Sequence, residues 1–210
     1  MNKVVVLGGS FNPPTIAHEK ILVQAVNSID ANLGLFVPSS HNYVAKKMRK
    51  QNKENQVLPE KVRMDMLEKM SSTYDNLGVD DCELGDDGRG HTYDTLVKIQ
   101  NKYKDSQIYF IIGYDTIRMI PRWHSKNDLV RKFKFIVFSR NNMDVQQELQ
   151  KYPLLVEHKD NFIQVDSPSG IENISSTLVR QNLQKGNAQI EHLISKSAID
   201  ILIANKNYLI

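Results

Sequence analysis

The chain has few of the residues that mark specialised protein classes. Its 210 residues include a single cysteine, Cys82, which excludes a disulfide framework and a cysteine-based zinc site. No apolar run approaches the ~18 residues of a transmembrane helix, and the run Val4–Leu7 is too short for the core of a signal peptide. We therefore expect a cytoplasmic protein that does not bind a membrane.

A strong charge of one sign is also lacking. The chain has 27 basic and 24 acidic residues, and its net charge of +3 is too small to indicate a nucleic-acid partner. Several motifs are missing as well. The sequence has no Walker loop, no GxGxxG fingerprint, no GxSxG elbow and no histidine pair at metal-ligand spacing. We therefore expect no protein metal site and no activated nucleophile.

What the sequence does have is an alternation of short apolar runs and longer amphipathic stretches. It predicts strands at Val4–Leu7, Leu33–Val37, Leu77–Val79, Ile108–Ile112, Phe133–Phe138 and Phe162–Val165. It predicts helices at Thr15–Asn27, Pro59–Met70, Thr92–Tyr103, Ser175–Gln184 and Ser197–Asn205, and a short one ending at Asp128–Lys132. This order is typical of an α/β fold, a Rossmann-like open parallel sheet with helices on both faces. Ligands of such sheets bind beyond the carboxyl ends of the strands.

The first candidate segment for binding runs from Gly8 to His18. It follows a predicted strand and opens a predicted helix, where glycines let backbone amides approach a phosphate and the helix N-terminus favours an anion. Thr15 is a suitable N-cap, and His18 falls in the first turn. A plain strand–turn–helix junction with a capping threonine accounts for the same residues about as well.

The second candidate segment is Ile174–Arg180. Ser175, Ser176 and Thr177 stand at a predicted helix start, and Arg180 shares the face of the last two. Hydroxyls, free amides and a guanidinium together suit a polyphosphate. Taken alone, a serine-capped helix with a solvated arginine is the simpler interpretation.

Gly113 and Asp115 follow the predicted strand Ile108–Ile112, where a ribose or base could be held. Trp123, the only tryptophan, could stack on a planar ring or belong to the core.

Two charged runs are expected to be solvated. Lys46–Lys53 has five basic residues in eight and is a candidate for phosphate capture, whereas Asp80–Asp87 has five acidic residues in eight and lacks the spacing of a calcium loop. Residues 39–56 have little apolar pattern and are expected to form a mobile loop that closes over substrate.

Together, the first two segments resemble the paired (H/T)xGH and ISSTxxR signatures of the nucleotidylyltransferase superfamily. Gly90–Leu96 is similar to the Tyr-Thr-x-Asp-Thr-Leu segment of nicotinate-nucleotide adenylyltransferases. Ile111–Asp115 with Trp123 is similar to their IIGxD…W segment.

The chain departs from these patterns at three places. Ala17 replaces a motif glycine, and Tyr114 stands where a small residue is expected. Ser39–Lys47 replaces the Pro-Pro-His-Lys that the family often has, which leaves open the preference for acid or amide and the choice between Lys46 and Lys47.

The resemblance implies direct transfer of AMP from ATP to nicotinate mononucleotide, with nicotinamide mononucleotide as a second acceptor, giving the dinucleotide and pyrophosphate in NAD biosynthesis. It implies catalytic roles for His18, Lys46 and Arg180. It implies ATP binding by Gly8, Gly9, Ser10, Phe11, His18, Gly113, Asp115, Ser175, Ser176, Thr177 and Arg180. It implies mononucleotide binding by Lys46, Lys47, Thr92, Trp123 and Arg140. Mg²⁺ would be held mainly by the ATP phosphates.

Because the two signature segments lie near opposite ends of the chain, one site needs both. We therefore expect residues 1–210 to form a single nucleotidylyltransferase domain, with 175–210 as a helical segment packed on the sheet. Two alternatives remain: a nucleotidylyltransferase with another phosphate acceptor, and a non-enzymatic nucleotide-binding module. The choice between a monomer and a homodimer stays open.

Overall fold

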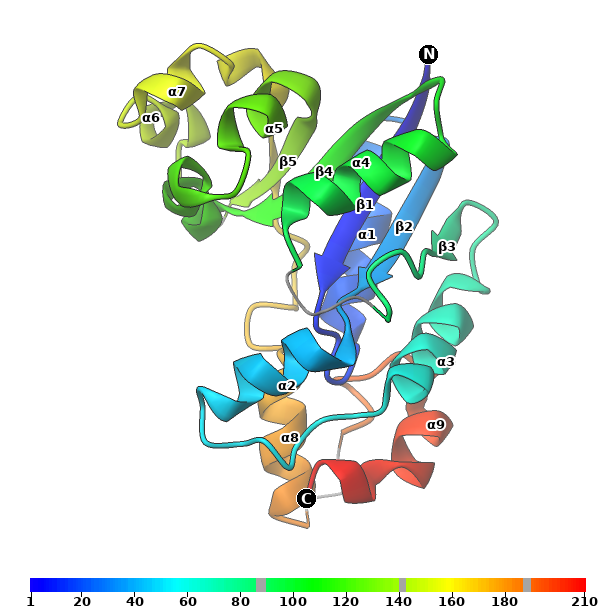
Figure 1. Ribbon diagram of the computed structural model, residues 1–210. Coiled ribbons are helices and arrows are strands. Elements are labelled where there is room, and N and C mark those ends of the chain that lie inside the picture. The colour runs from blue at the N-terminus through cyan, green and yellow to red at the C-terminus, as the bar shows by residue number, and fades with distance from the viewer. Residues whose placement is uncertain (86–89, 140–142, 187–189) are drawn as a thin grey trace.

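The computed structural model describes residues 1–85, 90–139, 143–186 and 190–210. Its centre is a six-stranded sheet in the order β3-β2-β1-β4-β5-β6 (Figure 1). The strands are β1 Asn2–Gly9, β2 Leu33–Pro38, β3 Leu77–Val79, β4 Ser106–Gly113, β5 Lys134–Ser139 and β6 Phe162–Asp166. All neighbouring strands are parallel, so the predicted open α/β sheet is confirmed.

Helices surround this sheet. They are α1 Ile16–Ser28, α2 His41–Arg49, α3 Glu60–Ser71, α4 Thr92–Lys102, α5 Lys126–Lys132, α6 Val145–Leu149, α7 Pro153–Val156, α8 Ser176–Gln184 and α9 Ile199–Ala204. The 3₁₀ helices are η1 Tyr114–Arg122, η2 Lys159–Asn161 and η3 Lys206–Tyr208. Within the described ranges, no helix combines the length and apolar content that a membrane crossing requires.

The side-chain alternation of β1 divides the core into two clusters, one on each face of the sheet. Val5 and Leu7 belong to a first cluster that includes buried residues of α1, α3, α8 and α9. Val4 and Val6 belong to a second cluster with buried residues of α4, η1, α5 and α6. Continuous apolar strands are thus covered on both sides, as parallel sheets require.

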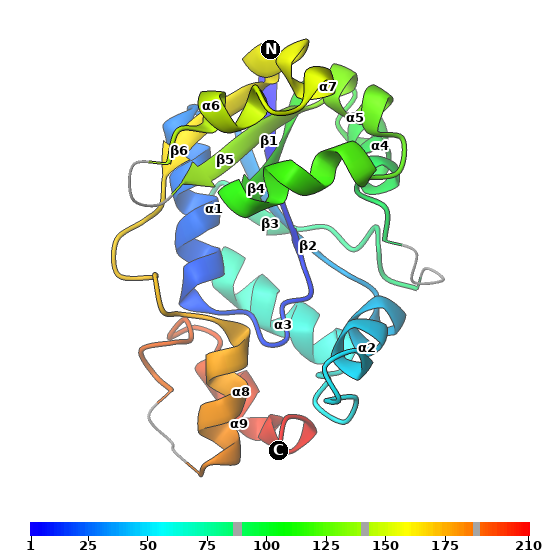
Figure 2. The same cartoon turned by 90° about the vertical axis from the view of Figure 1, so that its left-hand side faces the viewer.

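The C-terminal residues join the first cluster. Leu193 also accepts a backbone hydrogen bond from Ile16 at 3.0 Å, at the start of α1. Figures 1 and 2 both show α2 and α8 beyond the carboxyl end of β1. The strand order changes direction between β1 and β4, so this end of the sheet is the topological switch point.

The structure differs from the sequence prediction over residues 39–56. Instead of a loop, His41–Arg49 forms α2, and the Ser40 hydroxyl caps it by accepting a hydrogen bond from the Tyr43 amide. Its buried residues Val44 and Met48 pack with Val57 in a small apolar cluster.

The acidic run is also less solvated than expected. Asp80 is 7% exposed and accepts two 2.9 Å hydrogen bonds from Lys102, so this carboxylate has a structural partner. Asp86 and Asp87 lie outside the described residues.

Candidate active site

The site is built on the two glycines that end β1. A Cβ on Gly9 would lie 3.1 Å from the ring of Phe11, and one on Gly8 would lie 3.3 Å from Phe110. Phe11 itself has a φ of 42°, and its ring lies edge-on to His18 with 5.0 Å between centroids. Close aromatic packing, besides access for a ligand, therefore favours glycine here, since a larger residue would have to displace these rings by a few tenths of an ångström.

His18 has a defined tautomer in the first turn of α1. The Thr15 amide donates a 3.0 Å hydrogen bond to His18 Nδ1, so Nδ1 is the acceptor and Nε2 carries the hydrogen. Burial, assisted by the charge of Lys47, lowers the pKa of His18 to about 4. At neutral pH the ring is therefore an uncharged donor at the start of a helix.

Residues from the other end of the chain hold the loop between β1 and α1. Arg180 Nη1 donates to the Asn12 carbonyl at 2.6 Å, and the Ser176 hydroxyl donates to the Pro13 carbonyl at 2.7 Å. Arg180 Nη2 also donates to Thr177 Oγ1 at 3.1 Å. Arg180 is 4% exposed, and its Nε has no hydrogen-bond partner.

The Ser175 hydroxyl caps α8 by accepting a hydrogen bond from the Leu178 amide at 3.2 Å. Together with the bonds of Arg180 and Ser176 to the loop after β1, this makes the two motif segments one hydrogen-bonded unit.

The two lysines of α2 lie differently. Both are solvent-exposed, but Lys47 Nζ donates to Ser10 Oγ at 3.2 Å and lines the cavity described below, whereas Lys46 does not line it. Desolvation and the nearby charge of Arg180 lower the pKa of Lys47. Desolvation likewise lowers the pKa of Arg180, and no carboxylate contributes to either shift. Two cations therefore approach each other without an acidic counterpart.

These groups line a cavity of about 380 Å³, which we call the anion cavity. Its walls are Gly9, Ser10, Phe11, Asn12, Thr15, Ala17, His18, Ile21, Lys47, Met48, Gln51, Ile171, Ile174, Ser175, Ser176, Thr177 and Arg180. None of these described lining residues is acidic. The cavity combines cations, hydroxyls and a helix N-terminus, which suits a polyphosphate.

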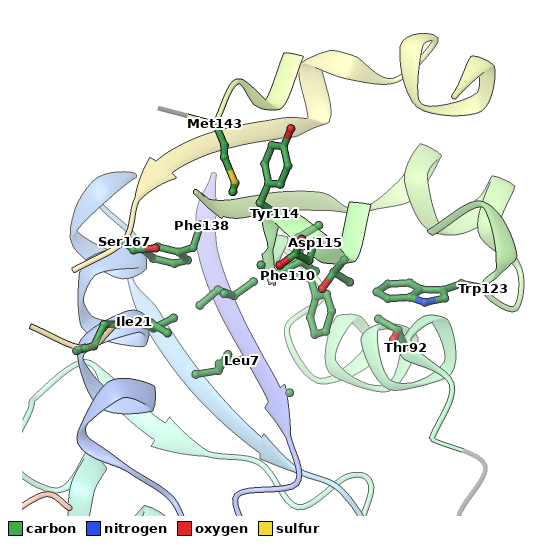
Figure 3. A pocket seen from close by; sticks show the side chains of 16 residues that line it. Leu7, Ile21, Thr92, Phe110, Tyr114, Asp115, Trp123, Phe138, Met143 and Ser167 are labelled. Atoms are coloured by element: carbon green, nitrogen blue, oxygen red, sulfur yellow. The ribbon is translucent and has the colours of Figure 1, made fainter. Parts of the chain in front are cut away.

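A second cavity of about 520 Å³, the aromatic cleft, adjoins it through the shared residues Ile21 and Ile171. Figure 3 shows Trp123 and Thr92 on one side of this cleft and Ile21 and Ser167 on the other. Both volumes fall in the range of small-molecule sites.

Gly113 and Asp115 line the aromatic cleft. A Cβ on Gly113 would meet nothing within 4 Å, so no neighbouring side chain demands a glycine there.

Tyr114, the unexpected large residue, is accommodated at the wall of the cleft. Its hydroxyl donates to Glu148 of α6 at 3.2 Å, and Figure 3 shows the ring beside Met143. The departure therefore adds a wall shared with α6.

Sequence reasoning assigned no function to three residues near the site. The Asn12 side chain accepts a 2.8 Å hydrogen bond from the Leu58 amide and donates one to the Gln56 carbonyl. Glu83 lines a smaller adjoining cavity and accepts the Thr95 hydroxyl. Arg63 donates a hydrogen bond to the Ser10 carbonyl. The sequence feature that could have identified it is an arginine on the same face of a predicted helix as the apolar residues Met66 and Met70.

Arg140, expected to bind the mononucleotide, lies outside the described residues. Among the residues that the structure does describe, no group of three His, Cys, Asp or Glu side chains could hold a metal ion.

Comparisons with known proteins agree with this architecture. A family model described as cytidylyltransferase-like matches residues 6–182. A probable nicotinate-nucleotide adenylyltransferase of Clostridium acetobutylicum is 29% identical over 209 residues, covering 99% of this chain and 100% of that protein. One from Streptococcus pyogenes is 30% identical over 200 residues, covering 95% of this chain and 85% of its own.

Among solved structures, Plasmodium falciparum nicotinic acid mononucleotide adenylyltransferase is similar in two complexes. The complex with APC gives a TM-score of 0.74 at 23% identity, and the complex with NaAD gives 0.73 at 24%. Each comparison covers 99% of this chain and 98% of the other. At these identities the likeness shows the fold.

Proposed function

Because the chain belongs to the cytidylyltransferase-like family, we propose that it transfers AMP from ATP to nicotinate mononucleotide, giving the dinucleotide and pyrophosphate. The observation that carries the proposal is an acid-free anion cavity that adjoins an aromatic cleft at the switch point of the sheet. The names of the similar Clostridium and Streptococcus proteins support nicotinate mononucleotide as the acceptor.

The ATP phosphates would occupy the anion cavity. His18 would donate its Nε2 hydrogen to a phosphate oxygen, where negative charge grows during in-line transfer. Ser175, Thr177 and Arg180 would bind the pyrophosphate that leaves. Catalysis would then consist of positioning and charge stabilisation, without a covalent intermediate.

Lys47 takes the role of neutralising the incoming phosphate, because it lines the anion cavity and Lys46 does not. Lys47 is already within hydrogen-bond distance of Ser10, and its lowered pKa reflects a site that favours a neutralising anion.

The mononucleotide would place its pyridine ring against Trp123. Thr92 is the first residue of α4, so its backbone amide has no partner within the helix and the dipole of α4 favours a negative group there. A ring carboxylate satisfies this position better than a carboxamide does. Gly113 and Asp115 would contact the ribose of ATP.

Mg²⁺ bound with ATP would neutralise part of the phosphate charge. The described lining of the anion cavity offers it no carboxylate, which fits an ion held mainly by phosphate oxygens.

The proposal is tested by measuring pyrophosphate release from ATP with nicotinate mononucleotide, nicotinamide mononucleotide and phosphopantetheine in parallel. We expect the highest kcat/KM with nicotinate mononucleotide. A preference for phosphopantetheine would assign a different acceptor. Absence of release with every acceptor would indicate a nucleotide-binding module instead of an enzyme.

A further inference from the structure

Arg63 is a buried cation that the proposed reaction does not use. It lies on α3, its exposed fraction is 0%, and it is the largest fully buried side chain of the described residues. Its Nη1 donates to the Ser10 carbonyl at 2.9 Å, whereas Nε and Nη2 have no hydrogen-bond partner. Burying a guanidinium with so few partners is costly, and a methionine would serve the packing of α3 better.

The surroundings of Arg63 compensate its charge only in part. Its neighbours on the buried face of α3 are Met66, Leu67 and Met70. Desolvation lowers the pKa of Arg63, and the one carboxylate that opposes this is Glu60. Glu60 also accepts a hydrogen bond from the His41 amide at the start of α2, so its charge is shared. The positive charge of Arg63 behind the loop that ends β1 is therefore offset only in part, by a carboxylate that also binds a backbone amide.

Ser10 connects Arg63 to the anion cavity. Arg63 binds its carbonyl, and Lys47 donates to its hydroxyl. The carbonyls of Asn12 and Pro13 are bound in the same way by side chains of α8. Three carbonyls of one loop are thus engaged by side-chain donors, which offsets part of the repulsion between their oxygens and a bound anion.

We propose that Arg63 is a positioning residue of the anion cavity, which holds the Ser10 carbonyl and adds buried positive charge behind a polyphosphate. It does not line the cavity itself, so it acts through Ser10. The identity of the polyphosphate as ATP rests on the proposed function, but the need for a polyanion does not.

The test compares Arg63→Met, Arg63→Gln and Lys61→Met. Lys61→Met is the matched control, because it removes the same charge from α3 at a side chain that is 84% exposed. Binding of inorganic pyrophosphate is measured by calorimetry, stability by urea unfolding, and activity by steady-state kinetics with ATP and the mononucleotide.

We expect Arg63→Met to weaken pyrophosphate binding at least ~10-fold, the size of a lost charge-assisted bond, and to lower kcat with little change in KM for the mononucleotide. The urea midpoint should stay near that of the wild type, because an unpartnered buried charge is removed. Arg63→Gln keeps a donor for Ser10 and should recover part of the affinity. Lys61→Met should behave as wild type.

Wild-type pyrophosphate affinity in Arg63→Met overturns the proposal, as does failure of the wild-type protein to bind pyrophosphate. Should Arg63→Met not fold, unchanged affinity in Arg63→Gln overturns it equally. If the wild-type protein adenylylates no acceptor but Arg63→Met still weakens pyrophosphate binding, the proposed function is wrong and the role of Arg63 in anion binding stands.

Discussion

At the scale of single residues, the protonation of His18 connects the site to stability. The capping bond from Thr15 and the burial of the ring both belong to the ligand-free fold, and burial lowers the pKa of His18 to about 4. A histidine with a lowered pKa stabilises the fold at pH values above its unfolded pKa of about 6.5, and this contribution is lost as the pH falls toward 4.

We therefore expect the free energy of unfolding to carry a His18 contribution that shrinks by about 2 kcal/mol between pH 7.5 and pH 5. The comparison is with His18→Asn, whose amide oxygen can still accept the Thr15 amide while the titrating ring is gone. Urea unfolding of both proteins at the two pH values measures the difference. Parallel losses in the two proteins would contradict the lowered pKa.

Gly113 is a second residue where the structure separates function from folding. A Cβ there would meet no atom within 4 Å, and the backbone has a φ of −80° and a ψ of 154°, which valine adopts readily. Gly113→Val should therefore keep the thermal midpoint but raise the KM for ATP at least ~10-fold by filling the aromatic cleft.

Gly34 provides the contrasting control. A Cβ on Gly34 would lie 2.6 Å from Leu77 and 2.7 Å from Val26, so Gly34→Ala should cost about 1–3 kcal/mol of stability. The activity of the molecules that remain folded should be unchanged. A Gly113→Val protein with normal KM would show that the ligand does not reach this wall.

Sequence reasoning succeeds at the residue scale where the chemistry is local. Thr15, His18 and Ser175 were predicted correctly as the caps and first-turn residue because capping depends on neighbours in the chain. Arg63 received no function because its meaning depends on Ser10, which lies 53 residues away in the sequence. Which lysine of α2 lines the anion cavity could not be decided from the sequence either, because that requires the orientation of the helix.

At the scale of elements, α2 buries little apolar surface. Its buried residues are Val44 and Met48, which form a small cluster with Val57 separate from the clusters on the two faces of the sheet. The apolar residues of this segment do not recur at helical spacing over a long enough stretch to predict a helix from the sequence. Elements with so little buried apolar surface open locally at low free energy.

We therefore expect Met48→Ala to speed amide exchange over residues 41–50 while lowering the global stability by less than about 1 kcal/mol. Because Lys47, which would neutralise the incoming phosphate, is on the same helix, the KM for the mononucleotide should rise. Hydrogen-exchange mass spectrometry with urea unfolding measures both effects. The matched control is Leu129→Ala on α5, a fully buried residue of the second cluster, which should lower the global stability by about 2–5 kcal/mol without a selective effect on α2. Equal global losses in the two variants would contradict a weakly attached α2.

At the scale of the whole molecule, the sequence predicted the class of the sheet, and the loops at the carboxyl ends of β1 and β4 line the cavities as expected. The alternation of apolar runs was sufficient for that, since buried parallel strands have a distinctive composition. The short helices α6 and α7 were missed because five- and four-residue helices carry too little pattern. The joining of β1 to α8 was inferred from paired motifs, and the hydrogen bonds of Arg180 and Ser176 give it a physical basis.

Whether the chain unfolds as one unit can be tested from opposite faces of the sheet. Leu202 of α9 is fully buried in the first cluster, together with residues of β1 and α3. Trp123, the single tryptophan, packs against the second cluster and meets Phe110 edge-on at 6.5 Å. Leu202→Ala should lower the free energy of unfolding by about 2–5 kcal/mol through the cavity it creates.

If residues 1–210 form one cooperative domain, the stability lost in Leu202→Ala must also destabilise the opposite face of the sheet, where Trp123 lies. The transition followed by Trp123 fluorescence should then move to lower urea together with the transition followed by circular dichroism, and the two should coincide. A circular-dichroism transition that moves while the fluorescence transition stays would show that the C-terminal segment unfolds separately. The Arg180 and Ser176 bonds to the Asn12 and Pro13 carbonyls favour the coincident result, because the C-terminal segment cannot leave without opening the loop of β1.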